Sequence, residues 1–281
     1  MKKIICFVLC VLTVLSIVSC ASASAKVKVI DIALTDEEYA FAVKKGNSEL
    51  LGQLNDFLAE IKANGVFDQI TDKYFGSGTP TAVTSAAQMK TDGSQLIVAT
   101  NAEFAPFEYT KGDSYYGVDM EIMKLFADKI GKELYINDML FESVVLAVGG
   151  ENAACDVAAC GMTVTEKRKE SLDFSTPYYQ ASQMVVVKAN DTTFDSCKTA
   201  EDVEKILKGF DKSKKAGVQS GTTGQYFCEG SEDWGFEGFG FTTKGYDSAA
   251  LAIQDVVNGN LDFVMVDEGP AKTIVKTVNG K

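Results

Sequence analysis

The 281-residue sequence contains no histidine. This absence removes the commonest general base and the commonest zinc ligand, so an enzyme or zinc protein would have to function without either. The sequence also lacks the Gly-x-x-x-x-Gly-Lys-Ser/Thr phosphate-binding motif, which argues against nucleotide hydrolysis by this chain. A formal net charge of −12 argues against a nucleic-acid partner, whose phosphates require basic patches.

Long hydrophobic runs are absent except at the N-terminus. The run from Ile4 to Val18 follows Lys2 and Lys3, and it is shorter than the ~20 residues of a membrane span. It predicts an export signal over residues 1–19. The end of this segment resembles the lipobox of bacterial lipoproteins, which implies lipidation of Cys20 and a place on the periplasmic or cell-surface side of the cytoplasmic membrane. Cleavage at an Ala-x-Ala site just after Cys20 is the alternative.

Four of the seven cysteines lie beyond Cys20. Cys155 and Cys160 lie five residues apart on one predicted strand, so we expect them on opposite faces and not bonded to each other. Cys197 and Cys228 could pair in an oxidising compartment, and the sequence leaves this open. None has Cys-x-x-Cys metal spacing, and we expect neither a metal nor a cofactor.

The first part of the mature chain combines strand and helix patterns. Alternating apolar residues predict strands over 26–34 and 39–43. Leucines at helical spacing then predict a helix from about Leu50 that is capped by Asn47 or Ser48 and stops at Gly65, and a second helix covers 67–75. Residues 77–94 are rich in Gly, Ser, Thr and Ala and are predicted to be a linker.

Strands and helices alternate in the rest of the chain, which is typical of helix-covered, mainly parallel sheets. Two alternating blocks predict two lobes with a cleft, lobe 1 over 95–186 and lobe 2 over 187–281. The predicted strands are 96–100, 133–136, 156–160, 184–187, 216–219 and 263–266, and the predicted helices are 119–130, 141–148, 247–257, one after Gly224 and one after Gly269.

Six motifs, in order, resemble the polar amino acid class of bacterial extracellular solute-binding proteins (family 3). They are Ala99 to Tyr109, Gly117 to Asp119, Cys155 to Arg168, Asp173 to Tyr179, Gly217 to Gly224 and Val266 to Glu268. The resemblance implies an α/β, two-lobed fold of the type II periplasmic-binding-protein kind. It also implies a monomer that captures a polar L-amino acid in an interlobe cleft and delivers it to the permease of an ABC transporter.

The order of segments departs from that family. The segment resembling Glu38 to Asn47, together with the elements up to Gly76, normally comes last, whereas here it comes first. The resemblance therefore implies a circular permutation. Residues 20–37 would then be a lipid-anchored start with a strand near lobe 2, and residues 38–76 would be the permuted C-terminal segment of lobe 1.

An α-amino acid carries a carboxylate and an ammonium group, and a dry cleft must neutralise both. Arg168 is predicted to bind the carboxylate through its planar fork, helped by Thr163 and Thr223. Asp267 is predicted to bind the ammonium. Without the resemblance, Arg168 would be interpreted as part of a solvated helix start, and Asp267 as a helix cap.

Other predicted ligand contacts surround these charges. Gly161 permits close backbone approach, and Phe104 and Phe141 are predicted to flank the aliphatic part of the ligand. The Cys160 thiol could also line the wall.

Ligand identity depends on three residues, and two alternatives remain open. Relatives that bind cationic amino acids often have an acid where this chain has Asn101. If Glu103 points into the cleft, its surplus negative charge would favour Arg or Lys. If Glu103 points to water, Asn101 and Gln219 suit Gln or a small polar ligand. We expect a slight preference for a cationic ligand.

Two other functions are weighed against transport. The first is a sensor that presents its liganded state to a receptor, although no signalling domain is attached. The second is a dehydratase-like enzyme on the same fold, for which no nucleophile and base pair stands out. The expected answer is a binding protein without catalytic residues.

Overall fold

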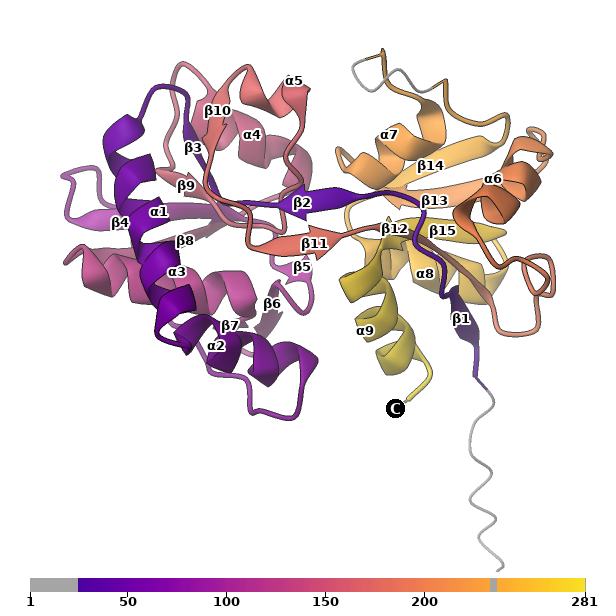
Figure 1. The fold of residues 1–281 in the computed structure, drawn as a ribbon, viewed down its shortest axis with the longest axis horizontal. Coiled ribbons are helices and arrows are strands. Elements are labelled where there is room, and N and C mark those ends of the chain that lie inside the picture. Colours follow the sequence, from indigo (N-terminus) through magenta and orange to yellow (C-terminus); the bar gives the residue numbers. More distant parts are fainter. Residues whose placement is uncertain (1–24, 233–236, 281) are drawn as a thin grey trace, which may run out of the picture.

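The computed structural model describes residues 25–232 and 237–280, and these form two lobes that lie side by side (Figure 1). Cys20, the predicted lipidation site, lies outside the described residues. The strands are β1 (Val27–Ile30), β2 (Glu37–Tyr39), β3 (Ala42–Lys44), β4 (Gln95–Thr100), β5 (Glu103–Phe104), β6 (Glu108–Lys111), β7 (Ser114–Tyr116), β8 (Glu133–Asp138), β9 (Val157–Ala158), β10 (Leu172–Phe174), β11 (Tyr179–Ala181), β12 (Gln183–Lys188), β13 (Lys215–Gln219), β14 (Thr242–Tyr246) and β15 (Phe263–Asp267). The helices are α1 (Ser48–Ala63), α2 (Val66–Phe75), α3 (Val118–Lys129), α4 (Phe141–Gly149), α5 (Glu166–Lys169), α6 (Ala200–Lys208), α7 (Thr223–Glu229), α8 (Ala249–Asn258) and α9 (Glu268–Val278).

Lobe 1 is a sheet covered by helices on both faces. Its strand order is β10-β3-β9-β4-β8. Alternate residues of β4 face opposite sides, as a pleated strand requires. Leu96 and Val98 pack with residues of α1, α2 and α3, whereas Ile97 and Ala99 pack with residues of α4. Because both faces are covered, β4 is buried along its whole length.

Lobe 2 repeats this arrangement with strand order β1-β12-β15-β13-β14. Apolar residues of α6 and α7 pack on one face of the sheet, and those of α8 and α9 pack on the other. In each lobe two neighbouring strand pairs are parallel and two are antiparallel. The prediction of mainly parallel sheets was therefore wrong. In each sheet, the strand that continues from a crossing strand runs antiparallel to both of its neighbours. This strand is β3 in lobe 1 and β12 in lobe 2.

Two antiparallel strands, β2 and β11, cross between the lobes (Figure 1). The strand predicted over 39–43 is in fact two strands, since β2 belongs to the crossing and β3 belongs to the sheet of lobe 1. Tyr39 pairs with Tyr179, and Glu37 pairs with Ala181. Along β2 the side chains of Glu37 and Tyr39 are buried, while Glu38 between them is exposed.

The start of α1 is capped as predicted, because the Asn47 side chain accepts a hydrogen bond from the backbone N–H of Leu50 at 3.4 Å. Gly65 adopts a left-handed φ of +79° between α1 and α2, a conformation that favours glycine. None of the helices of the described residues is long and apolar enough to cross a bilayer.

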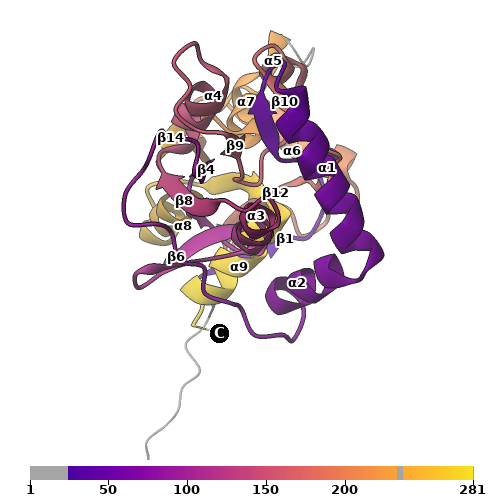
Figure 2. The ribbon, with the colours of Figure 1, turned by 90° about the vertical axis from the view of Figure 1, so that its left-hand side faces the viewer.

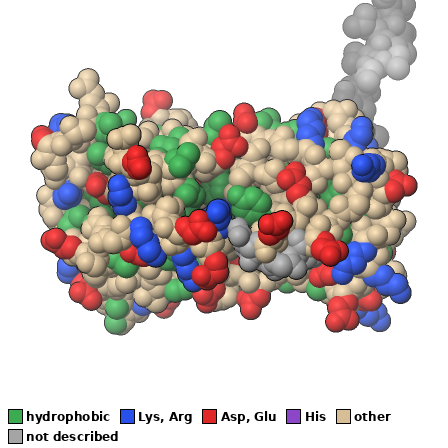
Figure 3. Space-filling view, turned by 90° about the horizontal axis from the view of Figure 1, so that it is seen from above, with side chains coloured by type: hydrophobic (Ala, Val, Ile, Leu, Met, Phe, Trp, Pro, Cys, Tyr) green, Lys and Arg blue, Asp and Glu red, His purple; other side chains and the backbone are tan. Residues whose placement is uncertain are grey.

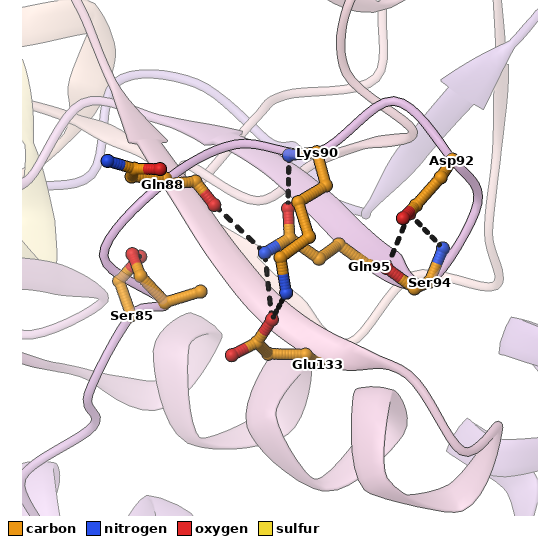
Figure 4. Close-up of polar contacts among 8 residues, drawn as sticks. Ser85, Gln88, Lys90, Asp92, Ser94, Gln95 and Glu133 are labelled. Atoms are coloured by element: carbon orange, nitrogen blue, oxygen red, sulfur yellow. Dashed lines mark hydrogen bonds and ion pairs between the residues drawn. The ribbon is translucent and has the colours of Figure 1, made fainter.

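The predicted linker is fastened to lobe 1. Gln95 Nε2 donates to the backbone carbonyl of Gln88 at 3.0 Å and to Glu133 Oε2 at 2.9 Å (Figure 4). Gln95 Oε1 in turn accepts from the backbone N–H of Lys90 at 2.7 Å. Gln95 is a buried residue of β4, and these hydrogen bonds join the linker to β4 and β8.

The first and last described elements lie side by side in both ribbon views (Figures 1 and 2). Asn279, which follows α9, binds the start of β1 through its side chain. Its Oδ1 accepts from the backbone N–H of Lys26 at 2.7 Å, and its Nδ2 donates to the carbonyl of Val27 at 2.9 Å.

The four cysteines of the described residues are free thiols, including Cys197 and Cys228. The expectation that Cys155 and Cys160 lie on opposite faces of one strand was wrong, since both belong to a single apolar cluster. The reason is that β9 contains only two residues, so strand alternation does not extend to either cysteine.

Candidate functional site

A small cavity lies between the lobes, and most of the residues predicted to bind a ligand line it. It measures about 10 Å³, which is room for about one water molecule. The lining residues are Phe104, Phe141, Cys160, Gly161, Thr163, Arg168, Gln219, Thr222, Thr223 and Asp267. Seen from above, the molecule shows hydrophobic side chains near its middle, with acidic and basic side chains around them (Figure 3).

A larger hollow of about 630 Å³ lies between α1 and the end of α3. Its charged lining residues, such as Glu49, Glu60 and Lys129, are exposed or half-buried, so it brings no buried charges together. The interlobe cavity does, and this property identifies it as the candidate site.

Arg168 supplies the buried cation of this site from lobe 1. It lies in α5, where the Thr165 hydroxyl accepts a hydrogen bond from its backbone N–H at 3.1 Å. Its guanidinium donates to the carbonyl of Thr163 at 2.7 Å and, across the lobes, to the carbonyl of Gly221 at 3.2 Å. The group also lies 5.3 Å from the centre of the Phe141 ring.

This arrangement leaves the Arg168 charge without an acidic partner. Among the described residues, no carboxylate lies within ion-pair distance of it. Burial lowers the pKa of the guanidinium, because a charge in low dielectric is disfavoured. The alternative of a solvated helix start does not describe Arg168, which is buried between two exposed lysines.

Asp267 supplies the buried anion from lobe 2, at the end of β15. Its Oδ2 accepts a hydrogen bond from the Tyr39 hydroxyl at 2.5 Å. It occupies the position before α9, yet its side chain makes no capping hydrogen bond, so the helix-cap alternative is not realised. Burial, and next the negative charge of Glu37, raise the pKa of Asp267 to about 7.

Glu37 is a buried carboxylate beside the site, and it was not among the residues predicted from the sequence. Its Oε2 accepts from the hydroxyl of Thr163 at 2.8 Å and from the hydroxyl of Thr223 at 2.7 Å. In the sequence it stands in an acidic run that resembles a solvated surface. The signal that could have found it is strand alternation, since it shares a face of β2 with Tyr39.

Of the two amides predicted to contact the ligand, Gln219 lines the cavity and Asn101 does not, but the two are hydrogen-bonded to each other. Gln219 Nε2 donates to Asn101 Oδ1 at 2.7 Å, which joins the two lobes. Asn101 Nδ2 donates to the carbonyl of Met139 at 2.8 Å. Gln219 Oε1 is buried and has no hydrogen-bond partner within residues 25–232 and 237–280. This part of the site therefore has an acceptor oxygen to satisfy.

Phe104, Phe141 and Gly161, which were predicted to lie against the ligand, are part of the cavity wall. Gly161 has a φ of +53°, and a Cβ atom there would approach the Phe104 ring to 2.8 Å. Glycine at this position therefore keeps both the backbone turn and the ring in place. Cys160 also lines the cavity, and burial raises the pKa of its thiol, so it is a poor thiolate.

Glu103 does not line the cavity. Its side chain is exposed, because β5 pairs with β6 and directs it away from the cleft. The alternative in which Glu103 adds a negative charge to the cleft was wrong for this arrangement. Two other buried carboxylates stand behind the cavity wall, namely Glu37 and Asp119, which accepts a hydrogen bond from the backbone N–H of Gly161 at 3.0 Å.

The protein has two sheet-based lobes joined by crossing strands, and one lobe supplies a cation and the other an anion to the cavity between them. These features define the class of two-lobed ligand-binding proteins. The chain belongs to the bacterial extracellular solute-binding proteins, family 3, which it matches over residues 8–77 and 96–265. The arginine-binding extracellular protein of Bacillus subtilis (strain 168) is 32% identical over 183 residues, covering 65% of each chain. A probable histidine-binding protein of Neisseria gonorrhoeae is 29% identical over 197 residues, covering 68% of this chain and 66% of its own.

A solved structure shows the same likeness. An ancestral arginine-binding protein bound to arginine is 33% identical, with a TM-score of 0.55, over 66% of this chain and 76% of its own. The chain spans about two thirds of the length of the curated relatives that it matches.

Proposed function

We propose that this chain is the extracytoplasmic binding component of an ABC transporter, which captures a polar L-amino acid between its lobes and delivers it to a membrane permease. The observation that carries the proposal is the pair of buried charges. Arg168 from lobe 1 and Asp267 from lobe 2 line the same cavity, and neither is in an ion pair among the described residues. The carboxylate and ammonium of an α-amino acid would neutralise both.

Capture requires the lobes to separate. The cavity of about 10 Å³ is too small for an amino acid. Contacts between the lobes occupy the positions that the ligand would take, namely Arg168 with the Gly221 carbonyl and Tyr39 with Asp267. Opening about β2 and β11 would release these groups, and closure on the ligand would exchange the contacts for ligand contacts. Closed lobes are the form that a permease would recognise.

The side chain of the ligand would lie between Phe104 and Phe141 and end near Asn101 and Gln219. The unpartnered oxygen of Gln219 favours a ligand whose far end donates hydrogen bonds. Arginine, lysine and glutamine all do so. The arginine- and histidine-binding names of the relatives support a slight preference for a cationic ligand.

The proposal includes lipid attachment at Cys20 and a circularly permuted chain. The contact between Asn279 and the start of β1 supports the permutation, because it places the two ends of the described chain where a continuous chain would pass. The linker over 77–94, fastened to lobe 1, would be the new connection. Action as a monomer, and on the periplasmic or cell-surface side of the membrane, belongs to the same proposal.

The competing functions lack a supporting observation at this site. The buried Cys160 is a poor nucleophile, and the cavity brings no nucleophile and base pair together among the described residues, so a dehydratase-like reaction is not favoured. A receptor-coupled sensor would need the same ligand site, and a different partner would distinguish it.

A thermal-shift screen of the refolded mature protein against the twenty L-amino acids tests the proposal. A ligand at a thousand times its Kd adds about 4 kcal/mol, which raises Tm by roughly 10 °C for a chain of this size. We expect such a shift with one or a few polar amino acids. If none of the twenty shifts Tm, the amino acid assignment is wrong.

A further inference from the structure

The Glu37 carboxylate is enclosed by hydrogen-bond donors from both lobes. Its Oε2 receives the hydroxyls of Thr163 in lobe 1 and Thr223 in lobe 2, at 2.8 and 2.7 Å. Its Oε1 receives the Thr35 hydroxyl at 2.7 Å and Gln183 Nε2 at 3.1 Å. Glu37 does not line the ligand cavity, whereas Thr163 and Thr223 do. Glu37 therefore stands directly behind two wall residues.

The hydrogen bonds of these two threonines decide what they can offer a ligand. A hydroxyl has one hydrogen to donate and two lone pairs to accept. An ionised carboxylate accepts only, so the single hydrogens of Thr163 and Thr223 must point at Glu37. Each hydroxyl can then present only lone pairs to the cavity. Gln183 Nε2, at 3.2 Å from Thr223 Oγ1, donates to it and reinforces this orientation.

We propose that Glu37 is a positioning residue that orients the hydroxyls of Thr163 and Thr223 as acceptors for the ligand's ammonium group. This inference rests on the proposed function. It differs from the sequence-based expectation that both threonines help Arg168 to bind the carboxylate, since hydroxyls without a free hydrogen would repel one. The ammonium group would then be bound by Asp267 and by two hydroxyl oxygens that accept hydrogen bonds. The carboxylate pole is left to Arg168 and backbone N–H groups.

The charges around the site agree with this division. Glu37 lies close enough to Asp267 that its negative charge is the second cause of the raised Asp267 pKa. Two carboxylates on one side of the cavity form a negative pole, and the guanidinium of Arg168 forms a positive one. A zwitterion placed between them has one orientation that satisfies both poles.

Substitution Glu37→Gln would reverse the hydroxyls. Two donors, the Thr35 hydroxyl and Gln183 Nε2, meet at the Oε1 position, so we expect the new amide to keep its oxygen there. Its NH₂ group would then donate to Thr163 and Thr223, and both hydroxyl hydrogens would turn towards the cavity. The wall would change from accepting hydrogen bonds to donating them, with almost no change in shape.

The experiment measures Kd by calorimetry for three ligands that share one side chain. L-Arginine carries both charged groups, agmatine lacks the carboxylate, and 5-guanidinopentanoate lacks the ammonium. If the wild-type protein prefers glutamine, the set is L-glutamine, 4-aminobutanamide and glutaramate. For E37Q we expect affinity for the first two ligands to fall by about 10- to 100-fold, the size of a lost hydrogen bond to a charged group. Affinity for the ligand without an ammonium should be unchanged or higher.

The matched control is Glu38→Gln, which removes the same charge from the next residue of β2, where the side chain is exposed. We expect no change in the ratios among the three ligands. If E37Q weakens all three ligands equally, Glu37 has only a structural role and the inference is wrong. If the wild-type protein binds no amino acid, the proposed function itself fails, and this result is distinct from the previous one.

A second pair of variants keeps the inference testable should E37Q unfold, which its Tm without ligand would reveal. Thr163→Val and Thr223→Val remove the proposed acceptors without changing the size of the side chains. Each should weaken L-arginine and agmatine by about 3- to 30-fold and leave 5-guanidinopentanoate within about 2-fold. Greater loss with 5-guanidinopentanoate than with agmatine would show that the hydroxyls serve the carboxylate, and would overturn the inference.

Discussion

The two lobes share one sheet architecture but solve opposite electrostatic problems at the cavity. Arg168 of lobe 1 is buried among carbonyl oxygens and an aromatic ring, which are favourable partners for a cation. Asp267 of lobe 2 is favoured as an anion by hydrogen bonding from Tyr39 and Gln183, but the negative charge of Glu37 nearby disfavours it. Hydrogen-bond acceptors therefore surround the positive pole before a ligand arrives, whereas a like charge stands beside the negative pole. The difference indicates that neutralising Asp267 contributes most to the affinity for a ligand.

The largest effect is expected from Asp267→Asn. This substitution leaves the ligand ammonium without its buried counter-charge, and breaking such a pair typically costs about 3–5 kcal/mol. We expect the Kd of the preferred amino acid to rise by about 100- to 4,000-fold in calorimetry. Glu268→Gln, at the next residue, is the control, since its carboxylate pairs with Lys272 at the surface and should leave Kd within about 2-fold. Equal losses in both variants would contradict the assigned pole.

The next effect concerns pH and the protein without ligand. The pKa values of Asp267 and Asp119 are both raised to about 7, in each case chiefly by burial. Between the ordinary aspartate pKa and about pH 7, the folded protein holds these protons while the unfolded chain has released them. The free energy of unfolding should therefore fall as pH rises from about 4 to 7.

Urea unfolding at pH 5 and pH 7.5 measures this change, which should amount to a few kcal/mol. Asp255 does not obscure it, because its pKa is lowered to about 2 and its contribution is lost only below that window. Asp267→Asn should reduce the pH dependence by its share. A flat or rising profile in the wild-type protein would contradict the difference between the poles.

Gly161→Ala should have a smaller effect, on the wall that both poles share. A Cβ atom would meet the Phe104 ring at 2.8 Å and would strain a backbone with a φ of +53°. We expect a loss of about 1–3 kcal/mol in the free energy of unfolding, and a higher Kd for every ligand. Gly46→Ala has a similarly positive φ of +84° but an open environment, so it separates the backbone strain from the clash with the ring. Equal effects of both substitutions would show that the ring is not constrained.

The smallest effect is expected at Asn101, which lies behind the cavity wall and is hydrogen-bonded to Gln219. Asn101→Asp would place a negative charge beside Gln219, where the ligand's side chain should end. Affinity for arginine relative to glutamine should rise by about 10-fold, since the new charge interacts only with a cationic side chain. Glu103→Gln, on the exposed side of β5, should leave this ratio unchanged. A change with Glu103→Gln would mean that this residue does face the ligand.

Much of the fold follows from sequence patterns because both sheets are continuous and helix-covered. The long apolar strands β4, β12 and β15 and the helices between them have clear periodicity, so their positions were predicted closely. The short elements were not predicted, namely β5, β6, β7, β10, β11, β14, α5 and α6. The crossing of β2 was missed for a physical reason. The strands β2 and β3 follow each other closely in the sequence, but β2 pairs with β11 between the lobes and β3 pairs with strands of lobe 1. Local periodicity does not indicate which strand each of them pairs with.

The site was predictable where the family resemblance added to a residue's chemistry, because chemistry alone would have left Arg168 as a solvated helix start and Asp267 as a helix cap. Arg168 and Asp267 were expected as opposite charges, and both line the cavity. Glu37 was not expected because its burial depends on donors that come from segments distant in the sequence, Thr163, Gln183 and Thr223. Glu103 was placed among the candidates because strand alternation was assumed to continue beyond Thr100, whereas β4 ends there and β5 turns away.

The most direct test of the account is a matrix of Kd values for Arg168→Met and Asp267→Asn with L-arginine, agmatine and 5-guanidinopentanoate. If the two residues hold opposite ends of one ligand, Arg168→Met should weaken L-arginine and 5-guanidinopentanoate but not agmatine. Asp267→Asn should weaken L-arginine and agmatine but not 5-guanidinopentanoate. If both variants weaken all three ligands to the same extent, the charges do not hold the two ends of an amino acid and the central claim is wrong.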